Sequence, residues 1–167
     1  MLKMRSLRAS LLVLVAAGAL IAPAAASADD QSVYNTFHNT HPRFQELRRE
    51  FERGERHWEN SGYSDPDAAY RACRRTAAKE RVVKKRMQAK KTSSTTGSKA
   101  RNRAVSGLEY RKKWADASRL AIEKFMQFDG YNYIRLHRKA KKYIARAQRY
   151  EEQAQKLFKK AGVKRNP

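Results

Sequence analysis

Basic side chains are the residues of this chain whose number and spacing could do chemistry. From residue 71 to residue 113 there are sixteen lysines and arginines and only two acids, Glu80 and Glu109, a net charge of +14. Cations at this density attract the phosphate or carboxylate groups of an extended anionic polymer and bind it by releasing its counterions. We therefore predict a polyanion-binding surface. If the polymer is nucleic acid, we expect phosphate contacts without base readout.

The predicted binding residues fall in residues 71–113 and along one line of residues 138–156. In chain order they are Arg71, Arg74, Arg75, Lys79, Arg81, Lys84, Lys85, Arg86, Lys90, Lys91, Lys99, Arg101, Arg103, Arg111, Lys112, Lys113, Arg138, Lys142, Arg149 and Lys156. The candidate partners are nucleic acid, a wall polymer and an anionic lipid surface. One alternative is that the positive charge binds no partner and serves only to keep the protein soluble. The other is an envelope or extracellular protein-interaction module, such as an inhibitor, a chaperone or a toxin component.

The remaining reactive side chains do not form a recognisable active site. His38 and His41 are three residues apart, but no cysteine or carboxylate follows at a further metal-ligand spacing, so a surface pair is the favoured interpretation. The segment 92–98 contains one glycine, Gly97, and matches no phosphate-binding loop. We therefore expect a protein that is not an enzyme and that uses no metal and no cofactor.

Cys73 is the only cysteine, so the chain has no internal disulfide. Ala69 and Ala72 lie beside it on a predicted helix, which favours a buried thiol. The alternative is an intermolecular disulfide that links a homodimer through Cys73.

The first 28 residues have the pattern of a secretory signal peptide. Three cations precede an apolar run over residues 11–26, which ends in an Ala-Ser-Ala cleavage site. The run contains Pro23 and is shorter than the ~20 residues of a membrane-spanning helix. We expect cleavage after residue 28, export by the general secretory route, and a periplasmic or extracellular location. From residue 29 onward, 35 basic and 16 acidic residues give a net charge of +19.

The strongest helical pattern runs from Tyr133 to Ala161. Apolar residues recur there at alternating spacings of three and four, which places them on one face of a helix. Alanines occupy every seventh position and are flanked by tyrosines and leucines, so a second helix could approach the alanine row closely. This spacing favours helix packing over base stacking as the role of the tyrosines. The opposite line carries Arg138, Lys142, Arg149 and Lys156.

Three further helices are expected, over residues 42–59, 66–91 and 99–128. The first carries apolar residues at helical intervals, the second begins at a Ser-Asp-Pro-Asp start signal, and the third has a broad apolar face. An Asp-Gly pair at 129–130 predicts a turn that makes the last two helices an antiparallel hairpin. The alternative is one continuous helix through Gly130. Gly162 predicts the end of the last helix.

Together these patterns predict an all-α fold, either a four-helix bundle or a long antiparallel helical hairpin with two supporting helices. We expect one domain with coiled-coil-like packing over residues 42–162. A polar arm over residues 29–41 should precede it. A flexible Ser/Thr loop is expected over residues 92–98, and a frayed tail over residues 163–167.

Overall fold

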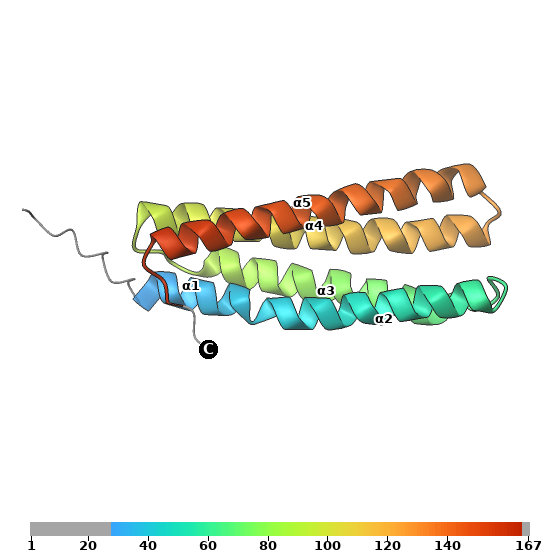
Figure 1. Cartoon of the computed structure of the whole chain (residues 1–167), viewed down its shortest axis with the longest axis horizontal. Coiled ribbons are helices and arrows are strands. Elements are labelled where there is room, and N and C mark those ends of the chain that lie inside the picture. Colours follow the sequence, from blue (N-terminus) through green and yellow to red (C-terminus); the bar gives the residue numbers. More distant parts are fainter. Residues whose placement is uncertain (1–27, 165–167) are drawn as a thin grey trace, which may run out of the picture.

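The computed structural model describes residues 28–164, and within that range the chain is all-α, as predicted. Five helices follow one another: α1 (Ala28–His38), α2 (Thr40–Asn60), α3 (Asp67–Ala89), α4 (Thr95–Met126) and α5 (Gly130–Lys160). They form an elongated bundle in which α1 and α2 lie end to end along one side (Figure 1). The predicted signal peptide at residues 1–28 lies outside the described residues except for its last position. No helix within residues 28–164 is long and apolar enough to cross a membrane.

The segment 29–41, expected as a polar arm, is helical and packed. Val33, Tyr34 and Phe37 of α1 are buried, and the ring of Tyr34 meets that of Phe158 at 5.4 Å. The arm prediction is therefore wrong, because the three apolar residues have helical spacing in an otherwise polar stretch. The helix is interrupted near Asn39. Pro42 has no N–H to donate to a carbonyl one turn earlier, which accounts for the break between α1 and α2.

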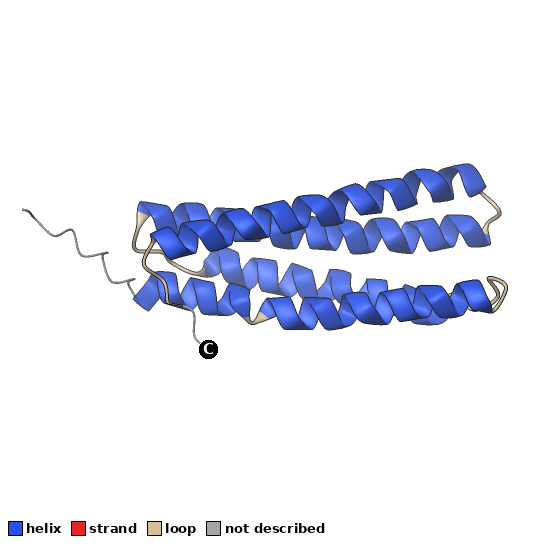
Figure 2. Ribbon diagram, in the orientation of Figure 1, coloured by secondary structure: helices blue, strands red, loops and turns tan. Residues whose placement is uncertain are grey.

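The connection between α3 and α4 is shorter and better held than a flexible Ser/Thr loop. α4 begins at Thr95 rather than near residue 99, and the Ser94 hydroxyl caps it by accepting a hydrogen bond from the Gly97 N–H at 2.8 Å. The Ser94 hydroxyl also donates to the Asp30 carboxylate of α1 at 2.5 Å. This carboxylate fills the space next to Gly97 that a β-carbon would occupy. The loop, which lies at the same end of the bundle as the start of α1 (Figure 2), is thereby tied to α1.

The predicted alanine row of α5 is confirmed as a close contact with α4. Ala140, Ala147 and Ala154 are buried, and α5 packs more extensively on α4 than on any other helix of the described chain. The flanking tyrosines take part in this packing, since the Tyr110 ring of α4 stacks on Tyr150 at 5.4 Å. Small residues at the contact allow the two helix backbones to approach closely.

The helix ends agree with the turn predictions. α4 ends at Met126, and Asp129 caps α5 by accepting the Asn132 N–H at 3.1 Å, so the antiparallel hairpin is confirmed. Gly162 ends α5 with a φ of 77°, as expected. The tail is not frayed where it is described. Val163 donates to the Phe158 carbonyl at 3.1 Å, and Lys164 bonds to the Gln31 side chain.

The core consists of two apolar clusters that lie one after the other along the bundle. One gathers Phe44, Trp58, Cys73 and Trp114 with their neighbours. The other lies toward the end that contains α1 and the α3/α4 loop, and gathers Phe37, Met87, Leu108 and Phe158 with theirs. What separates the two clusters is a layer of buried charge, described below.

Candidate polyanion surface and a buried charge layer

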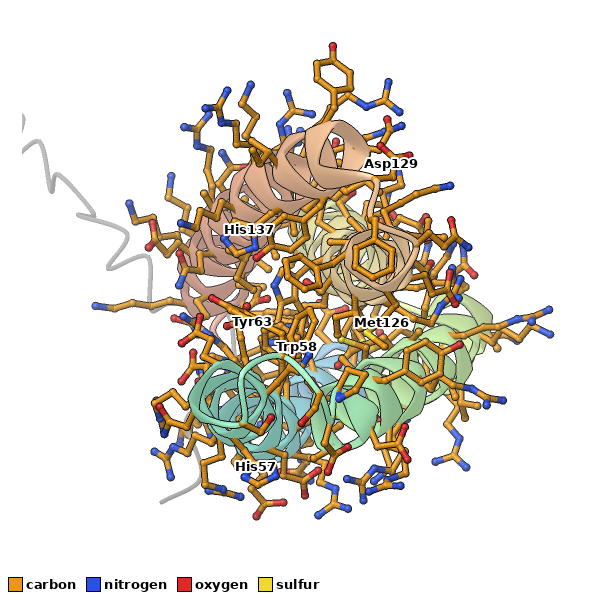
Figure 3. All side chains as sticks on the ribbon, turned by 90° about the vertical axis from the view of Figure 1, so that its right-hand side faces the viewer. His57, Trp58, Tyr63, Met126, Asp129 and His137 are labelled. Carbon is orange, nitrogen blue, oxygen red and sulfur yellow. The ribbon has the colours of Figure 1, made fainter. Side chains whose placement is uncertain are left out.

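The structure places most of the predicted binding residues on the surface. Of the twenty, fourteen are exposed and five are half-buried. The exposed ones come from α3, the α3/α4 loop, the first two-thirds of α4 and the outer face of α5, and nitrogen-tipped side chains surround the bundle when it is viewed along its axis (Figure 3).

Five of these cations already have a carboxylate partner, which reduces what they can offer to a polyanion. Arg71 pairs with Asp67, Arg75 with Glu50, Lys84 and Lys113 with Glu109, and Lys112 with Asp116. Twelve others have no ion pair with any described residue: Arg74, Lys79, Arg81, Lys85, Arg86, Lys91, Lys99, Arg103, Arg138, Lys142, Arg149 and Lys156. The Lys90 ammonium instead donates a hydrogen bond to the Ser32 hydroxyl, and the Arg101 guanidinium donates one to the Lys90 carbonyl.

Unpaired cations gather at one end of the bundle, which we call the basic end. This end holds the α3/α4 loop, the beginning of α1 and the last turns of α5, on the left of Figure 1. The basic end is defined by six exposed residues without a described carboxylate partner: Lys85, Arg86, Lys91, Lys99, Arg103 and Lys156. Five of them come from the end of α3, the loop after it and the start of α4, and Lys156 comes from α5, which is distant in sequence. The Arg103 guanidinium also lies 5.6 Å from the Tyr150 ring centroid of α5, a contact that links α4 to α5.

The twenty residues do not form one continuous face. α3 and α4 run antiparallel, as the contacts of Tyr70 with Glu123 and of Lys84 with Glu109 show. Arg71, Arg74 and Arg75 therefore lie toward the opposite half of the bundle from the basic end. Arg138 and Lys142 also lie in that half, but on α5, which α4 separates from α3. The prediction of a single surface is corrected to one dense end and two smaller groups.

Arg111 is not a surface residue, and its prediction as a polyanion contact is wrong. Its side chain has no exposed area, and its Nε donates to Glu151 Oε1 of α5 at 2.6 Å. The guanidinium also faces Glu80 Oε1 of α3 at 3.7 Å and lies 4.3 Å above the Phe44 ring of α2. One charge is thus shared between two buried carboxylates and an aromatic face.

His41 completes this arrangement from α2, so that all four sides of the bundle contribute one residue. Its Nδ1 lies 3.1 Å from an Arg111 nitrogen and 3.4 Å from Glu151 Oε2. We call His41, Glu80, Arg111 and Glu151 the charge layer. The His41 side chain is still 44% exposed, as expected of a surface histidine, although one ring nitrogen faces the buried guanidinium. His38 is half-buried and stacks on Tyr34 at 5.4 Å. No group of three metal-binding side chains in residues 28–164 is placed to hold a metal ion.

Glu80 is the least satisfied member of the charge layer. Burial raises the pKa of its carboxyl to about 7, although the Arg111 guanidinium acts in the opposite direction. Its Oε2 is buried without a hydrogen-bond partner among the described residues. Glu80 also lines a cavity of about 570 Å³ between α3 and the α1/α2 junction, with walls that include Phe44, Leu47 and Val83.

Cys73 is a free, fully buried thiol, which confirms the favoured interpretation. Burial raises the pKa of the thiol well above its usual range. A sulfur atom with no exposed surface cannot reach a second chain while the bundle is folded. The disulfide-linked homodimer is therefore not supported.

Glu80 and Glu151 were not among the predicted site residues, although the sequence contains a signal for them. Glu151 lies four residues after Ala147 and three before Ala154, which are both buried positions of the α5 stripe. Glu80 has the same relation to Thr76 and Val83 on α3. A carboxylate at a stripe position, with an arginine at the equivalent position of another helix, is the pattern that predicts a charge layer.

Searches of protein-family models, of curated proteins and of solved structures found no match to this chain.

Proposed function

We propose that this protein binds an extended polyanion through the basic end. The observation that carries the proposal is that Lys85, Arg86, Lys91, Lys99, Arg103 and Lys156 are exposed, have no ion pair with a described residue, and meet at one end of a rigid bundle. Unpaired cations keep their full charge for a ligand, whereas ion-paired ones have to give up an existing partner first.

The mechanism is electrostatic and needs no base-specific contact. Each phosphate neutralised by a lysine or arginine releases condensed counterions, so the affinity falls steeply as salt is added. The loop that joins α3 to α4 is held to α1 through Asp30 and Ser94, so the backbone that carries the cations on both sides of it is held in place. A preorganised surface loses less conformational entropy when it binds. With the leader that the sequence predicts, the proposed place of action is the periplasm or the extracellular space.

The test is fluorescence anisotropy with a labelled DNA duplex at increasing NaCl concentration. We expect log K to fall linearly with log salt, by about 0.9 per phosphate contact. The variant Lys85→Gln/Arg86→Gln/Lys91→Gln/Lys99→Gln should weaken binding and reduce this slope. Inorganic polyphosphate, which has no bases, should compete with the duplex.

The matched control removes the same number of charges from ion-paired positions. The variant Arg71→Gln/Arg75→Gln/Lys112→Gln/Lys113→Gln loses four cations whose partners are Asp67, Glu50, Asp116 and Glu109. It should bind more tightly than the basic-end variant. Absent or salt-independent binding would contradict the proposal, as would an equal loss of affinity in both variants.

A further inference from the structure

Exposed apolar side chains gather at the end of the bundle that lies opposite the basic end. Seven large apolar residues are exposed in the described chain, and six of them lie at or near this end: Tyr63, Leu120, Met126, Phe128, Tyr131 and Ile134. Val82 of α3 is the exception. Single exposed apolar residues are ordinary, but a group of them at one place on a monomer marks an interaction site. We call Met126, Phe128, Tyr131 and Ile134 the aromatic tip.

Phe128 presents its ring to solvent at a conformational cost. It follows α4 in the left-handed region, with a φ of 57°, and it is 97% exposed. The Asp129 N–H donates to the Lys124 carbonyl at 2.9 Å, which is the bond that closes a Schellman cap. Glycine usually occupies this position, as Gly162 does after α5. A phenylalanine here strains the backbone relative to the right-handed region, and no intramolecular packing of its ring offsets that strain.

Cations adjoin the aromatic tip along the outer face of α5. Tyr131 and Ile134 begin this face, and at helical spacing it continues with Arg135, Arg138, Lys139 and Lys142. These six residues line an open hollow of about 470 Å³. None of the four cations has an ion pair with a described carboxylate, although Lys139 lies 5.8 Å from the Tyr143 ring centroid. Apolar side chains and cations without a described carboxylate partner are therefore adjacent on one outer surface.

We propose that the aromatic tip docks end-on into an anionic phospholipid bilayer. Aromatic rings partition into the membrane interface, and lysine and arginine side chains beside them reach the lipid phosphates. Each such cation adds about a fivefold gain in affinity for an anionic surface. Phe128 and Tyr131 are 97% and 80% exposed at the end of the bundle, an arrangement that enters a lipid surface more readily than it fills a groove on a protein partner.

The charges at this end also orient the docked bundle. Near this end the α2/α3 side carries Glu55, Glu59 and Asp65 beside Arg53, Arg56 and Arg71, so its charges nearly cancel, whereas the α5 side carries the four cations with no acid between residues 130 and 150. Figure 3 views this end directly and shows Asp129, where α5 begins, on the far side of the end face from His57 of α2. Attraction to anionic lipid therefore tilts the α5 side toward the membrane.

This inference does not rest on the proposed function of the basic end. The two sites lie at opposite ends of α4, whose 32 residues span about 48 Å. A bundle docked by its tip would hold the basic end away from the lipid, free for a second ligand.

The experiment measures binding of the full-length mature chain to vesicles by flotation. The probes are vesicles of phosphatidylcholine alone and of phosphatidylcholine with about one-third phosphatidylglycerol. We expect the native chain to bind the anionic vesicles at least about tenfold more tightly than the neutral ones. The affinity for anionic vesicles should fall at least about tenfold in two variants, Phe128→Ser/Tyr131→Ser and Arg135→Gln/Arg138→Gln/Lys139→Gln/Lys142→Gln. Val82→Ser, which removes an exposed apolar residue outside the tip, should bind as the native chain does.

A second readout locates the tip in the bilayer. In Phe128→Trp, the emission of the introduced tryptophan should shift to the blue on anionic vesicles and be quenched by brominated lipids. Trp58 and Trp114 are buried and supply a constant background. The proposal is overturned if the native chain does not bind anionic vesicles, if the serine variant binds as well as the native chain, or if the emission of the introduced tryptophan does not respond. It is also overturned if the basic-end variant loses as much vesicle affinity as the tip variant. If the native chain binds anionic vesicles but does not bind DNA, the result counts only against the proposed function of the basic end.

Discussion

Arg111 of α4 and Glu151 of α5 form an ion pair with an Nε–Oε1 distance of 2.6 Å inside the bundle, and neither side chain is more than 7% exposed. Glu80 and His41 approach the same guanidinium from α3 and α2. Leu108 and Trp114 lie on either side of Arg111 in α4 and belong to the two different apolar clusters. The charge layer thus lies between the two clusters and divides the core.

Removing the Glu151 carboxylate alone should cost more than removing the whole charge layer. In Glu151→Gln, Arg111 keeps only the more distant Glu80, so we expect the free energy of unfolding to fall by about 3 kcal/mol. In Arg111→Met/Glu80→Gln/Glu151→Gln the buried guanidinium and both carboxylates are gone, and most of the loss should be recovered. Urea denaturation of both variants at neutral pH measures the difference. A triple variant less stable than the single one would show that the layer itself stabilises the fold.

Glu80 gives the stability a specific pH dependence. Below its ordinary pKa of 4.5 the carboxyl is protonated in both the folded and the unfolded chain and contributes nothing. Between 4.5 and about 7 the unfolded chain releases the proton while the folded chain retains it, so the folded state loses stability as the pH rises. Above about pH 7 the carboxyl is ionised in both states, and the full cost of burying the Glu80 carboxylate is present. Across this window the free energy of unfolding of Glu80→Gln should therefore rise relative to that of the native chain, by on the order of 3 kcal/mol.

Chemical denaturation of both chains at a series of pH values measures this difference. Leu108, which lies beside the layer and does not titrate, offers a control in Leu108→Met, whose difference from the native chain should not vary with pH. If Glu80→Gln instead loses stability relative to the native chain as the pH rises, the Arg111–Glu80 attraction outweighs the cost of burying the carboxylate.

The regular part of the fold could be predicted from periodicity, because each long helix buries one stripe against its neighbours. The alanine row from Ala140 to Ala154 predicted the α4/α5 contact without any structural information. α1 was missed, because most of its residues are polar and only Val33, Tyr34 and Phe37 mark its buried face. Its burial depends on α4 and α5, which follow much later in the chain.

The charge layer and the surface arrangement could not be predicted, because both depend on contacts between distant segments. Arg111 had the same local context as its exposed basic neighbours, and only the positions of Glu80 and Glu151 on other helices distinguish it. Formal charge also does not separate Arg75, which is paired with Glu50, from Arg74, which has no described partner. Such pairings become visible only when helices have been placed side by side.

Gly54 marks the closest approach of α2 to α3, and its replacement should be destabilising. A β-carbon at this position would lie 2.5 Å from the backbone nitrogen of Ala69, which cannot move without shifting α3. We expect Gly54→Ala to lower the free energy of unfolding by about 1–3 kcal/mol. Gly130→Ala is the matched control, because a β-carbon there would meet nothing within 4 Å. Thermal unfolding of both variants tests this, and equal midpoints would show that α2 and α3 can separate without cost.

Phe128→Gly should make the protein more stable while weakening its binding to anionic vesicles. Glycine adopts the positive φ of this cap without the strain of about 1–2 kcal/mol that an L-residue carries, and its larger loss of backbone entropy on folding offsets about 0.5–1 kcal/mol of that gain. We therefore expect the melting temperature to rise by about 2–4 °C. Phe128→Ala keeps the strain and removes only an exposed ring, so its melting temperature should equal that of the native chain, while its vesicle binding falls as in the glycine variant. If both variants are instead less stable than the native chain, the Phe128 ring is packed within the protein in solution, and the aromatic tip is not free to enter a membrane.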